Sequence, residues 1–344
     1  MKNAMNSRER VNKAIEFKDP DRVPISHAVL PAAQLKYGEQ LDEILSEFRD
    51  DFGWDYLEDL PLKDFPALYK KGRQVDDFGT IWNVEWNGIC GIPVEFPIID
   101  LDQYQEYQWP DVFSAGQPAY RQYSGHMVDG NGEWYPRGAW ITYFEQMQQL
   151  LGMENFFMEM ASESDNLISF MDDMLAFNLA WIDKWIKLDY DGLQFADDWG
   201  GQNSLLINPN TWRRLFKPRY AKMFKKVHDS GMHVWFHSDG FINDIVPDLI
   251  EIGVNVINCQ TSVMGNDWVA KNMREKVAIR TDIDRQYILP FGSPQEVREE
   301  VLRTFKACGS SKGGIIACGE IGPDVPLDNI HALYKAFVEF GRYR

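Results

Sequence analysis

From residue 192 onward, short apolar segments alternate regularly with longer amphipathic segments. The apolar segments have the length of buried strands, about five residues, and the amphipathic segments show helical periodicity. The predicted strands are 192–197, 233–237, 254–259, 277–281 and 314–318, and the predicted helices are 211–230, 242–252, 268–275, 294–307 and 327–341. Strands and helices that alternate across short turns are typical of βαβ units, so we expect a parallel sheet.

The N-terminal half supplies further elements of the same kind at less regular spacing. Asn6 followed by Glu9 resembles a helix capping box and predicts a short helix that ends near Phe17. Strands are expected at 23–29 and 138–144, with an eighth hidden in 121–130, and helices at 145–150, 155–160 and 165–188. Eight strands favour an α/β fold, a closed (β/α)8 TIM barrel. The alternative is a doubly wound open sheet, but no G-x-G-x-x-G fingerprint follows the first strand.

Residues 38–125 interrupt this pattern. They contain an acidic helix at 39–48, an aromatic-rich strand pair around 77–87 and a Pro-containing segment near Trp109. We interpret them as an N-terminal elaboration that caps the barrel with a hairpin. Because barrels of this type use about 250 residues or more and accept insertions, residues 1–344 are predicted to form a single domain.

Charge and composition exclude several classes of partner. The net charge is −17, and no cluster of Lys and Arg offers the basic surface that nucleic acid requires. Residues 1–10 are polar, and no apolar run approaches the roughly 18 residues of a membrane span. Four cysteines without CxxC spacing indicate reduced thiols. These features predict a cytoplasmic protein that acts on a small molecule.

The strongest candidate site follows the predicted strand 233–237, which ends in His237-Ser-Asp239 before Gly240. The carboxyl ends of barrel strands carry the functional residues in this fold. His237 and Asp239 are two residues apart, so their side chains point to the same side and can share one metal ion or one proton. In the alternative interpretation, Asp239 caps the next helix and His237 is a hydrogen-bonded interior imidazole.

Acidic residues follow two other predicted strands. Asp197 and Asp198 are adjacent, so at most one of them can face the site. Two carboxylates at the end of an apolar strand are costly to bury, which favours a function, although capping of the following turn is the alternative. Glu145 stands at a predicted helix start, where a carboxylate also stabilises free N–H groups.

Other strand ends supply candidate ligands and substrate-binding groups. Cys259 and Cys318 are candidate thiolate partners of His237 in a zinc site, because zinc takes Cys and His in a tetrahedral shell. Free cysteine is also a common core residue. Structural roles are expected for His126, His228, His233 and His331. The predicted substrate-binding residues are Trp199, Gln202, Gln260, Arg280, Asp282 and Glu320.

Several segments together resemble the uroporphyrinogen decarboxylase superfamily. They are Ser7-Arg-Glu-Arg-Val-Asn-Lys-Ala-Ile with Asp19-Pro-Asp-Arg-Val-Pro, Phe144-Glu before Gly152-Met-Glu-Asn-Phe, Asp197-Asp-Trp-Gly-Gly-Gln, Pro209 through Pro218, Phe236-His-Ser-Asp-Gly, and Gly319-Glu-Ile-Gly-Pro-Asp-Val-Pro-Leu-Asp-Asn-Ile. The resemblance covers most of the chain outside 38–125. It implies a (β/α)8 barrel in one of two branches, cofactor-free porphyrinogen decarboxylases or zinc-dependent methyltransferases.

The two branches differ at residues that the sequence shows. Decarboxylases of this superfamily carry an N-terminal Arg-Gln-Ala-Gly-Arg loop that grips the substrate carboxylates, whereas here the first predicted strand is followed by Leu30-Pro-Ala-Ala-Gln-Leu-Lys. A chain of charge −17 has no evident substitute for that cationic clamp. The resemblance therefore favours the methyltransferase branch over decarboxylation of uroporphyrinogen.

The zinc motif of the methyltransferases is His-x-Cys followed by a later Cys. Here Asp239 stands in the place of the first Cys, and Cys318 is displaced by one residue. The resemblance implies a metal site formed by His237, Asp239 and Cys318 with Glu145 assisting, because a carboxylate can ligate zinc. Without zinc, His237 and the pair Asp197 and Asp198 are expected to act as general acid and base.

The predicted function is a methyltransferase that moves a methyl group between a corrinoid protein and a small thiol or folate. Its predicted catalytic residues are His237, Asp197, Asp198 and Glu145. Zinc and a partner-borne corrinoid are the expected cofactors, and no tightly bound cofactor is the alternative. Relatives are often homodimers. Two other functions stay open: decarboxylation of a porphyrinogen or a smaller carboxylated substrate, and a non-catalytic barrel that binds a corrinoid or tetrapyrrole.

Overall fold

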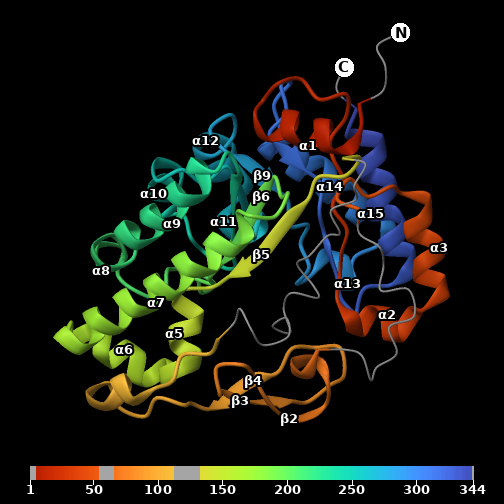
Figure 1. The fold of residues 1–344 in the computed structure, drawn as a ribbon. Helices are drawn as coiled ribbons and strands as arrows, with labels where there is room; N and C mark the ends of the chain where they lie inside the picture. The colour runs from red at the N-terminus through yellow and green to blue at the C-terminus, as the bar shows by residue number, and fades with distance from the viewer. Residues whose placement is uncertain (1–4, 54–65, 112–131, 343–344) are drawn as a thin grey trace.

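The computed structural model describes residues 5–53, 66–111 and 132–342. Six strands form one parallel sheet in the order β10-β9-β8-β7-β6-β5, so strands that are consecutive in the chain are neighbours in the sheet. Helices connect each strand to the next and cover the outside of the sheet (Figure 1). The strands are β5 (Arg137–Ile141), β6 (Gly192–Ala196), β7 (His233–Ser238), β8 (Val256–Cys259), β9 (Ala278–Arg280) and β10 (Ile315–Ile316).

Backbone hydrogen bonds connect β10 to β5 through other segments of the chain, so the strands form a ring. β1 (Ala28–Val29) pairs in parallel with β11 (Glu320–Ile321), and Ile25 forms a parallel bridge to Ala317 just after β10. Residue 51 lies between this segment and β5: its N–H donates to the carbonyl of Ile25 at 2.8 Å, and its carbonyl accepts from Tyr135 at 3.3 Å. The fold is therefore the expected α/β barrel. The eighth strand expected at 121–130 lies outside the described residues, and residues 50–52 occupy the position between β1 and β5.

The predicted helices are present, with one split, one helix that begins four residues later than predicted (α10, at Val246), and the short helices α2, α11 and α13 that were not predicted. The predicted helix 211–230 is two helices that meet at Phe216, because Pro218 lacks the N–H that a continuous helix needs. Asn6 caps α1 as predicted. The helices are α1 (Ser7–Ile15), α2 (Pro31–Tyr37), α3 (Glu39–Glu47), α5 (Phe144–Leu151), α6 (Met153–Ser162), α7 (Asp165–Trp185), α8 (Pro209–Leu215), α9 (Lys217–Asp229), α10 (Val246–Glu251), α11 (Thr261–Met264), α12 (Asn266–Asn272), α13 (Ile288–Phe291), α14 (Pro294–Cys308) and α15 (Leu327–Phe340), with 3-10 turns at Ala67–Tyr69 and Leu101–Glu106. None of these described helices is long and apolar enough to cross a membrane.

The predicted hairpin is present and gains a third strand. β2 (Gly72–Val75), β3 (Ile81–Val84) and β4 (Ile92–Glu95) form an antiparallel sheet, called the cap sheet below. In Figure 1 the cap sheet and α1 lie at opposite ends of the molecule, and the arrow of β5 points toward the cap sheet. Thr80 joins the cap sheet to α5 by donating to the carbonyl of Gln149 at 2.7 Å. The cap sheet therefore lies on the side of the carboxyl ends of the strands.

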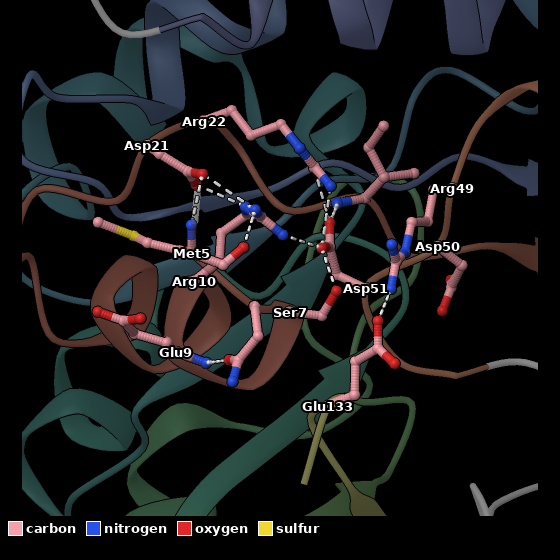
Figure 2. Close-up of polar contacts among 12 residues, drawn as sticks. Met5, Ser7, Glu9, Arg10, Asp21, Arg22, Arg49, Asp50, Asp51 and Glu133 are labelled. Atoms are coloured by element: carbon pink, nitrogen blue, oxygen red, sulfur yellow. Dashed lines mark hydrogen bonds and ion pairs between the residues drawn. The ribbon is translucent and has the colours of Figure 1, made fainter. Parts of the chain in front are cut away.

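A buried carboxylate connects α1 to the barrel at the end opposite the cap sheet. The Asp51 side chain is fully buried and accepts hydrogen bonds from Ser7, Arg10, Arg22 and the backbone of Ile25 (Figure 2). Hydrogen bonds between charged groups are about twice as strong as neutral ones, so this network compensates the buried charge. The helix that precedes the barrel is thus held to the segment that completes the ring.

Two levels of side chains fill the barrel interior. Trp235, Val256 and Ala278 are neighbours in the strand register and belong to a buried apolar cluster with Phe52 and Ile316. Side chains two residues further along a strand point to the same side. The next level toward the carboxyl ends therefore comes from His237, Asn258 and Arg280, which are also register neighbours. A layer of apolar side chains in the barrel interior therefore lies beneath a layer of polar side chains.

Candidate functional site

The polar level lines a small cavity, partly open to solvent, at the carboxyl ends of the strands. His237, Asn258 and Arg280 contribute from β7, β8 and β9. The other lining residues are Ala28, Asp239, Cys259, Asp282, Arg285, Cys318 and Glu320. The predicted position of the site, at the strand ends around His237, therefore coincides with a cavity among the described residues.

Hydrogen bonds fix the protonation of the His237 ring. Its Nδ1 lies 2.9 Å from Oδ1 of Asn258. That oxygen also accepts from Nη1 of Arg280 at 2.7 Å, while the Asn258 amide nitrogen donates to the carbonyl of Arg280 at 3.0 Å. Because Oδ1 can only accept, Nδ1 of His237 must donate. The neutral ring therefore keeps the lone pair on Nε2.

Two carboxylates face that lone pair. Nε2 of His237 lies 3.7 Å from Oδ1 of Asp198 and 3.6 Å from Oδ1 of Asp239. One ligand atom from each of the three residues lies within 4.8 Å of the other two, and no other such His, Cys, Asp and Glu group occurs among the residues the structure describes. One imidazole nitrogen and two carboxylate oxygens form a donor set that suits zinc or another divalent transition metal. The residues present thus fit a metal ion.

Two glycines bring the carboxylates together. Gly240 has φ +79°, which favours glycine, and an added Cβ there would lie 2.1 Å from the carbonyl oxygen of Gly200. The loops after β6 and β7 can therefore touch, and the Gly200 N–H donates to the Asp239 carbonyl at 3.1 Å. Asp198 in turn accepts from the Asp239 N–H at 2.8 Å. This close approach of two backbones places Asp198 beside Asp239.

Asp239 does not cap the following helix. α10 begins at Val246, and Ile245 at its cap makes no side-chain cap bond. The second carboxylate oxygen of Asp239 instead accepts from Arg285. The first oxygen faces His237, so Asp239 bridges the cation and the imidazole.

Asp197 and Asp198, the two residues that follow β6, point to different surroundings. The Asp197 carboxylate is fully buried and accepts from the backbone of Tyr143 and Glu145 and from the Tyr220 hydroxyl. Burial raises its pKa. Asp198, with 43% of its side chain exposed, is the one beside His237. Asp197 therefore positions the start of α5, and its predicted catalytic role stays a prediction.

Glu145 stands in the first turn of α5. Burial, followed by the negative charges of Asp198, Asp197 and Asp239, raises its pKa well above the ordinary 4.5. A protonated carboxyl here can donate a hydrogen bond. On the cap sheet, burial and then the charge of Glu145 raise the pKa of Cys90 to about 11. The loop between β3 and β4 therefore lies close to Glu145.

Arg285 and Asn258 were not among the predicted site residues. Arg285 donates to Glu320 at 2.6 Å and to Asp239, and its Nε lies 3.5 Å from Asp282. Burial raises the pKa of Asp282 to about 7, against the attraction of Arg285. Asn258 had a detectable signal, because it is a polar residue near the carboxyl end of the predicted strand 254–259, where functional residues of this fold lie. Arg285 had none, since it follows β9 by several residues on a loop.

The remaining predicted residues divide into two groups. Arg280, Asp282, Glu320, Cys259 and Cys318 line the cavity. Cys318 is not one of the three clustered ligands, because Asp198 takes that position. Burial raises the pKa of the Cys318 thiol to about 11. The role of Cys318 as a metal ligand stays a prediction.

Three predicted substrate-binding residues lie outside the cavity lining. Trp199 is fully buried and stacks on Phe144 with ring centroids 3.8 Å apart. Gln260 is buried and accepts from the Gly240 N–H at 2.9 Å. Gln202 is exposed. His228 and His233 make structural contacts, to the Gly253 carbonyl and the Tyr135 hydroxyl, and His126 lies outside the described residues.

Comparison with solved structures identifies the fold. A methyltransferase from Methanosarcina mazei superposes with a TM-score of 0.70 at 14% identity, covering 98% of this chain and 99% of that chain. Two others have scores too low to carry an argument. A dihydropteroate synthase from Anaplasma phagocytophilum has a TM-score of 0.34 at 16% identity, covering 51% and 69% of the two chains. A xylanase from Gloeophyllum trabeum has 0.36 at 10%, covering 60% and 76%.

The family is shown by sequence. No curated protein matches the chain. Residues 138–340, more than half of the chain, match the family model described as uroporphyrinogen decarboxylase (URO-D). This region contains β5 to β11 and all three residues of the His237 cluster. The chain belongs to the uroporphyrinogen decarboxylase family.

Proposed function

We propose that this protein is a methyltransferase that moves a methyl group between a corrinoid protein and a small thiol or folate acceptor. The observation that carries the proposal is the fixed tautomer of His237, whose Nε2 lone pair faces Asp198 and Asp239. These three side chains can ligate a metal ion. They differ from the arginines that hold the substrate carboxylates in the decarboxylases. The whole-chain likeness in fold to a methyltransferase supports the same branch of the family.

The residues of the cluster have distinct tasks in this reaction. A divalent metal held by Asp198, His237 and Asp239 would supply a Lewis acid that binds the acceptor thiol and lowers its pKa. Asn258 keeps the His237 ring in the orientation that the cluster requires. Asp198 is partly exposed, so the thiol proton can leave to solvent on its side of the cluster. The corrinoid of the partner protein would supply the methyl group to the acceptor sulfur, and cobalt would keep the electron pair of the cobalt–carbon bond.

The charges of the cavity disfavour a substrate with many carboxylates. Arg285 already contacts three carboxylates, those of Asp239, Asp282 and Glu320. Arg280 donates to Asn258 and Ser26. An anionic tetrapyrrole would therefore meet Asp239, Asp282 and Glu320, whose shared cation Arg285 is already occupied. This argues against decarboxylation of uroporphyrinogen.

Metal analysis and a methyl-transfer assay test the proposal together. Protein purified without chelators is expected to hold about one transition metal per chain, and His237→Ala to hold none. Methylcobalamin serves as donor, with 2-mercaptoethanesulfonate or tetrahydrofolate as acceptor, and loss of the methylcobalamin absorbance reports turnover. His331→Ala is the matched control, because His331 is an exposed partner of Glu47 far along the chain from the cluster.

Three outcomes overturn the proposal. Absence of a transition metal from the wild type would remove the metal site. Release of CO₂ from uroporphyrinogen or a smaller carboxylated substrate would make the protein a decarboxylase. A coloured corrinoid or tetrapyrrole that co-purifies without turnover in either assay would indicate a binding barrel.

A further inference from the structure

A β-bulge in β5 determines the direction of Trp140. Gly138 pairs with Leu193 of β6. Three residues later Ile141 pairs with Phe195, although only two residues separate the two partners on β6. In a regular strand Trp140 would lie opposite Phe195, whose side chain packs on α9 outside the sheet. Because the bulge adds one residue, Ile141 takes that outward position and Trp140 turns toward the barrel interior.

The bulge has a strained backbone. Ala139 has φ +62°, a left-handed conformation that favours glycine. Strain of this kind persists only where the surrounding structure enforces it, and it is concentrated at catalytic and ligand-binding sites. The strand therefore keeps an unfavourable conformation that places Trp140 on the inner side.

The indole of Trp140 lies beside the imidazole of His237. Their ring centroids are 5.8 Å apart, and the ring planes are inclined by 38°. β6 lies between the strands of these two residues, and its residue opposite His237 is Ala196. Because alanine carries only a methyl group, the indole can reach the imidazole across it. Asn258 and Arg280 come from the strands on the other side of His237, so Trp140 stands next to the cavity and not among the residues that line it.

Trp140 is exposed although its neighbours in the strand are buried. It is 41% exposed, whereas Ala139 and Ile141 are buried. The partly exposed carboxylate of Asp198 lies 3.7 Å from Nε2 of the same His237 ring. An indole offers a π face to a ligand, and a carboxylate offers hydrogen-bond acceptors. Side by side, the two groups fit a flat conjugated ring that carries N–H donors on its edge.

We propose that Trp140 is a substrate-binding residue on which a flat heterocycle stacks, with its N–H edge toward Asp198. The pterin ring of a folate has this chemistry, whereas a small thiol has no π face. The inference rests on the proposed function and deepens it, because it favours a folate over a thiol as the acceptor. Stacking on Trp140 holds the ring beside His237, where the methyl group would be transferred.

Calorimetric titration with folate and with p-aminobenzoylglutamate tests this role, because the second compound lacks the pterin ring. The wild type is expected to bind folate, and to bind p-aminobenzoylglutamate about 10-fold more weakly or not at all. Trp140→Ala should weaken folate binding about 5- to 100-fold, which is the typical loss when a heterocycle loses its aromatic stacking partner. Trp140→Phe should recover part of the affinity.

Trp134→Ala is the matched control. Trp134 precedes β5 and therefore lies near the amino end of that strand, where the guanidinium of Arg49 lies 4.6 Å from its ring centroid. This variant should bind folate like the wild type. Equal loss of folate binding in Trp134→Ala and Trp140→Ala would overturn the inference.

Thermal unfolding separates a ligand-binding role from a structural one. Because Trp140 is exposed, Trp140→Ala without ligand should unfold close to the wild type. Folate should raise the melting temperature of the wild type but not of Trp140→Ala. If Trp140→Ala does not fold, Trp140→Leu replaces it in both measurements, because leucine fills part of the space without a π face.

Four results overturn the inference. They are a wild type that does not bind folate, equal affinity of the wild type for folate and p-aminobenzoylglutamate, and equal folate affinity in the wild type and the Trp140 variants. The fourth is binding of hydroxocobalamin in place of folate with the same dependence on Trp140, because the stacked ring would then be a corrin.

The titrations do not depend on methyl transfer. If neither acceptor is methylated while Trp140→Ala loses folate binding, the proposed function falls and the stacking role of Trp140 stands. If 2-mercaptoethanesulfonate is methylated and Trp140→Ala binds folate like the wild type, the stacking role falls alone.

Discussion

The imidazole of His237 and the amide of Asn258 lie 2.9 Å apart across neighbouring strands, and this contact determines which ring nitrogen faces the acidic residues. Arg280 completes the arrangement by occupying the same amide oxygen. The ring is therefore oriented by residues that lie on rigid strands and need not contact a ligand themselves.

Replacing Asn258 should weaken metal binding without removing a ligand. Asn258→Leu is expected to lower metal affinity about 10- to 100-fold, because the ring loses the partner that fixes its tautomer. Competition with a chromophoric chelator measures the change. Asn272→Leu is the control, since Asn272 lies at the end of α12 and donates to the carbonyl of Trp268 in the same helix. Unchanged affinity in Asn258→Leu would show that Asn258 does not orient the ring.

Asp239→Cys should change which metal the cluster prefers. A thiolate is a softer ligand than a carboxylate and favours zinc over manganese or magnesium. It also releases Arg285 from its bond to Asp239. Metal analysis after equilibration with equal zinc and manganese should therefore show a higher zinc share than in the wild type. The same ratio in both proteins would place Asp239 outside the metal shell.

Arg285→Gln should destabilise the metal-free protein. It leaves Asp239, Asp282 and Glu320 near one another without their shared cation, and we expect a loss of about 2–3 kcal/mol in unfolding free energy. Arg298→Gln breaks a surface pair with Glu339 and should cost about 0–1 kcal/mol. Urea denaturation compares the two variants. Equal losses would mean that the Arg285 cluster is screened by solvent like a surface pair.

Glu145 should make stability fall as the pH rises. Because its pKa is raised in the folded protein, the folded state keeps a proton that the unfolded chain releases above about pH 4.5. This contribution is complete below that pH and declines as pH rises toward the folded pKa, by at most about 1.4 kcal/mol per pH unit. Glu145→Gln should therefore gain stability over the wild type between pH 5 and 8.

Urea denaturation of chelator-treated protein at several pH values measures that gain. Glu154→Gln, at an exposed position on α6, should show no such trend. A difference between Glu145→Gln and the wild type that stays constant with pH would show that Glu145 is ionised in the folded protein.

The order of strands and helices could be predicted from residue 192 onward, because each strand is a short apolar run and each helix is amphipathic with helical periodicity. The ring position at 50–52 was not, since this segment joins its neighbours through two backbone hydrogen bonds and carries the charged Asp50 and Asp51. Asp51 resembles a surface residue in the sequence, and only the convergence of Arg10 and Arg22 explains its burial.

The centre of the candidate site was also predictable. The spacing of His237 and Asp239 predicted both on one side of a strand end, whereas the sequence left open which of Asp197 and Asp198 faces them. The directions of Asp197 and Trp199 were not predictable, because they depend on Tyr143, Tyr220 and Phe144, which come from distant parts of the chain.

Residues 25–29 and 50–52 complete the ring of strands, and this affects which fragment of the chain can be expressed on its own. The region that matches the family model begins at residue 138, one residue after Arg137 and beyond both of these segments. Cut to that region, the sheet would present β5 and β10 as two open edges, and unprotected edges pair with other chains. We therefore expect a fragment limited to the matched region to associate with other chains through these edges rather than fold as a closed barrel.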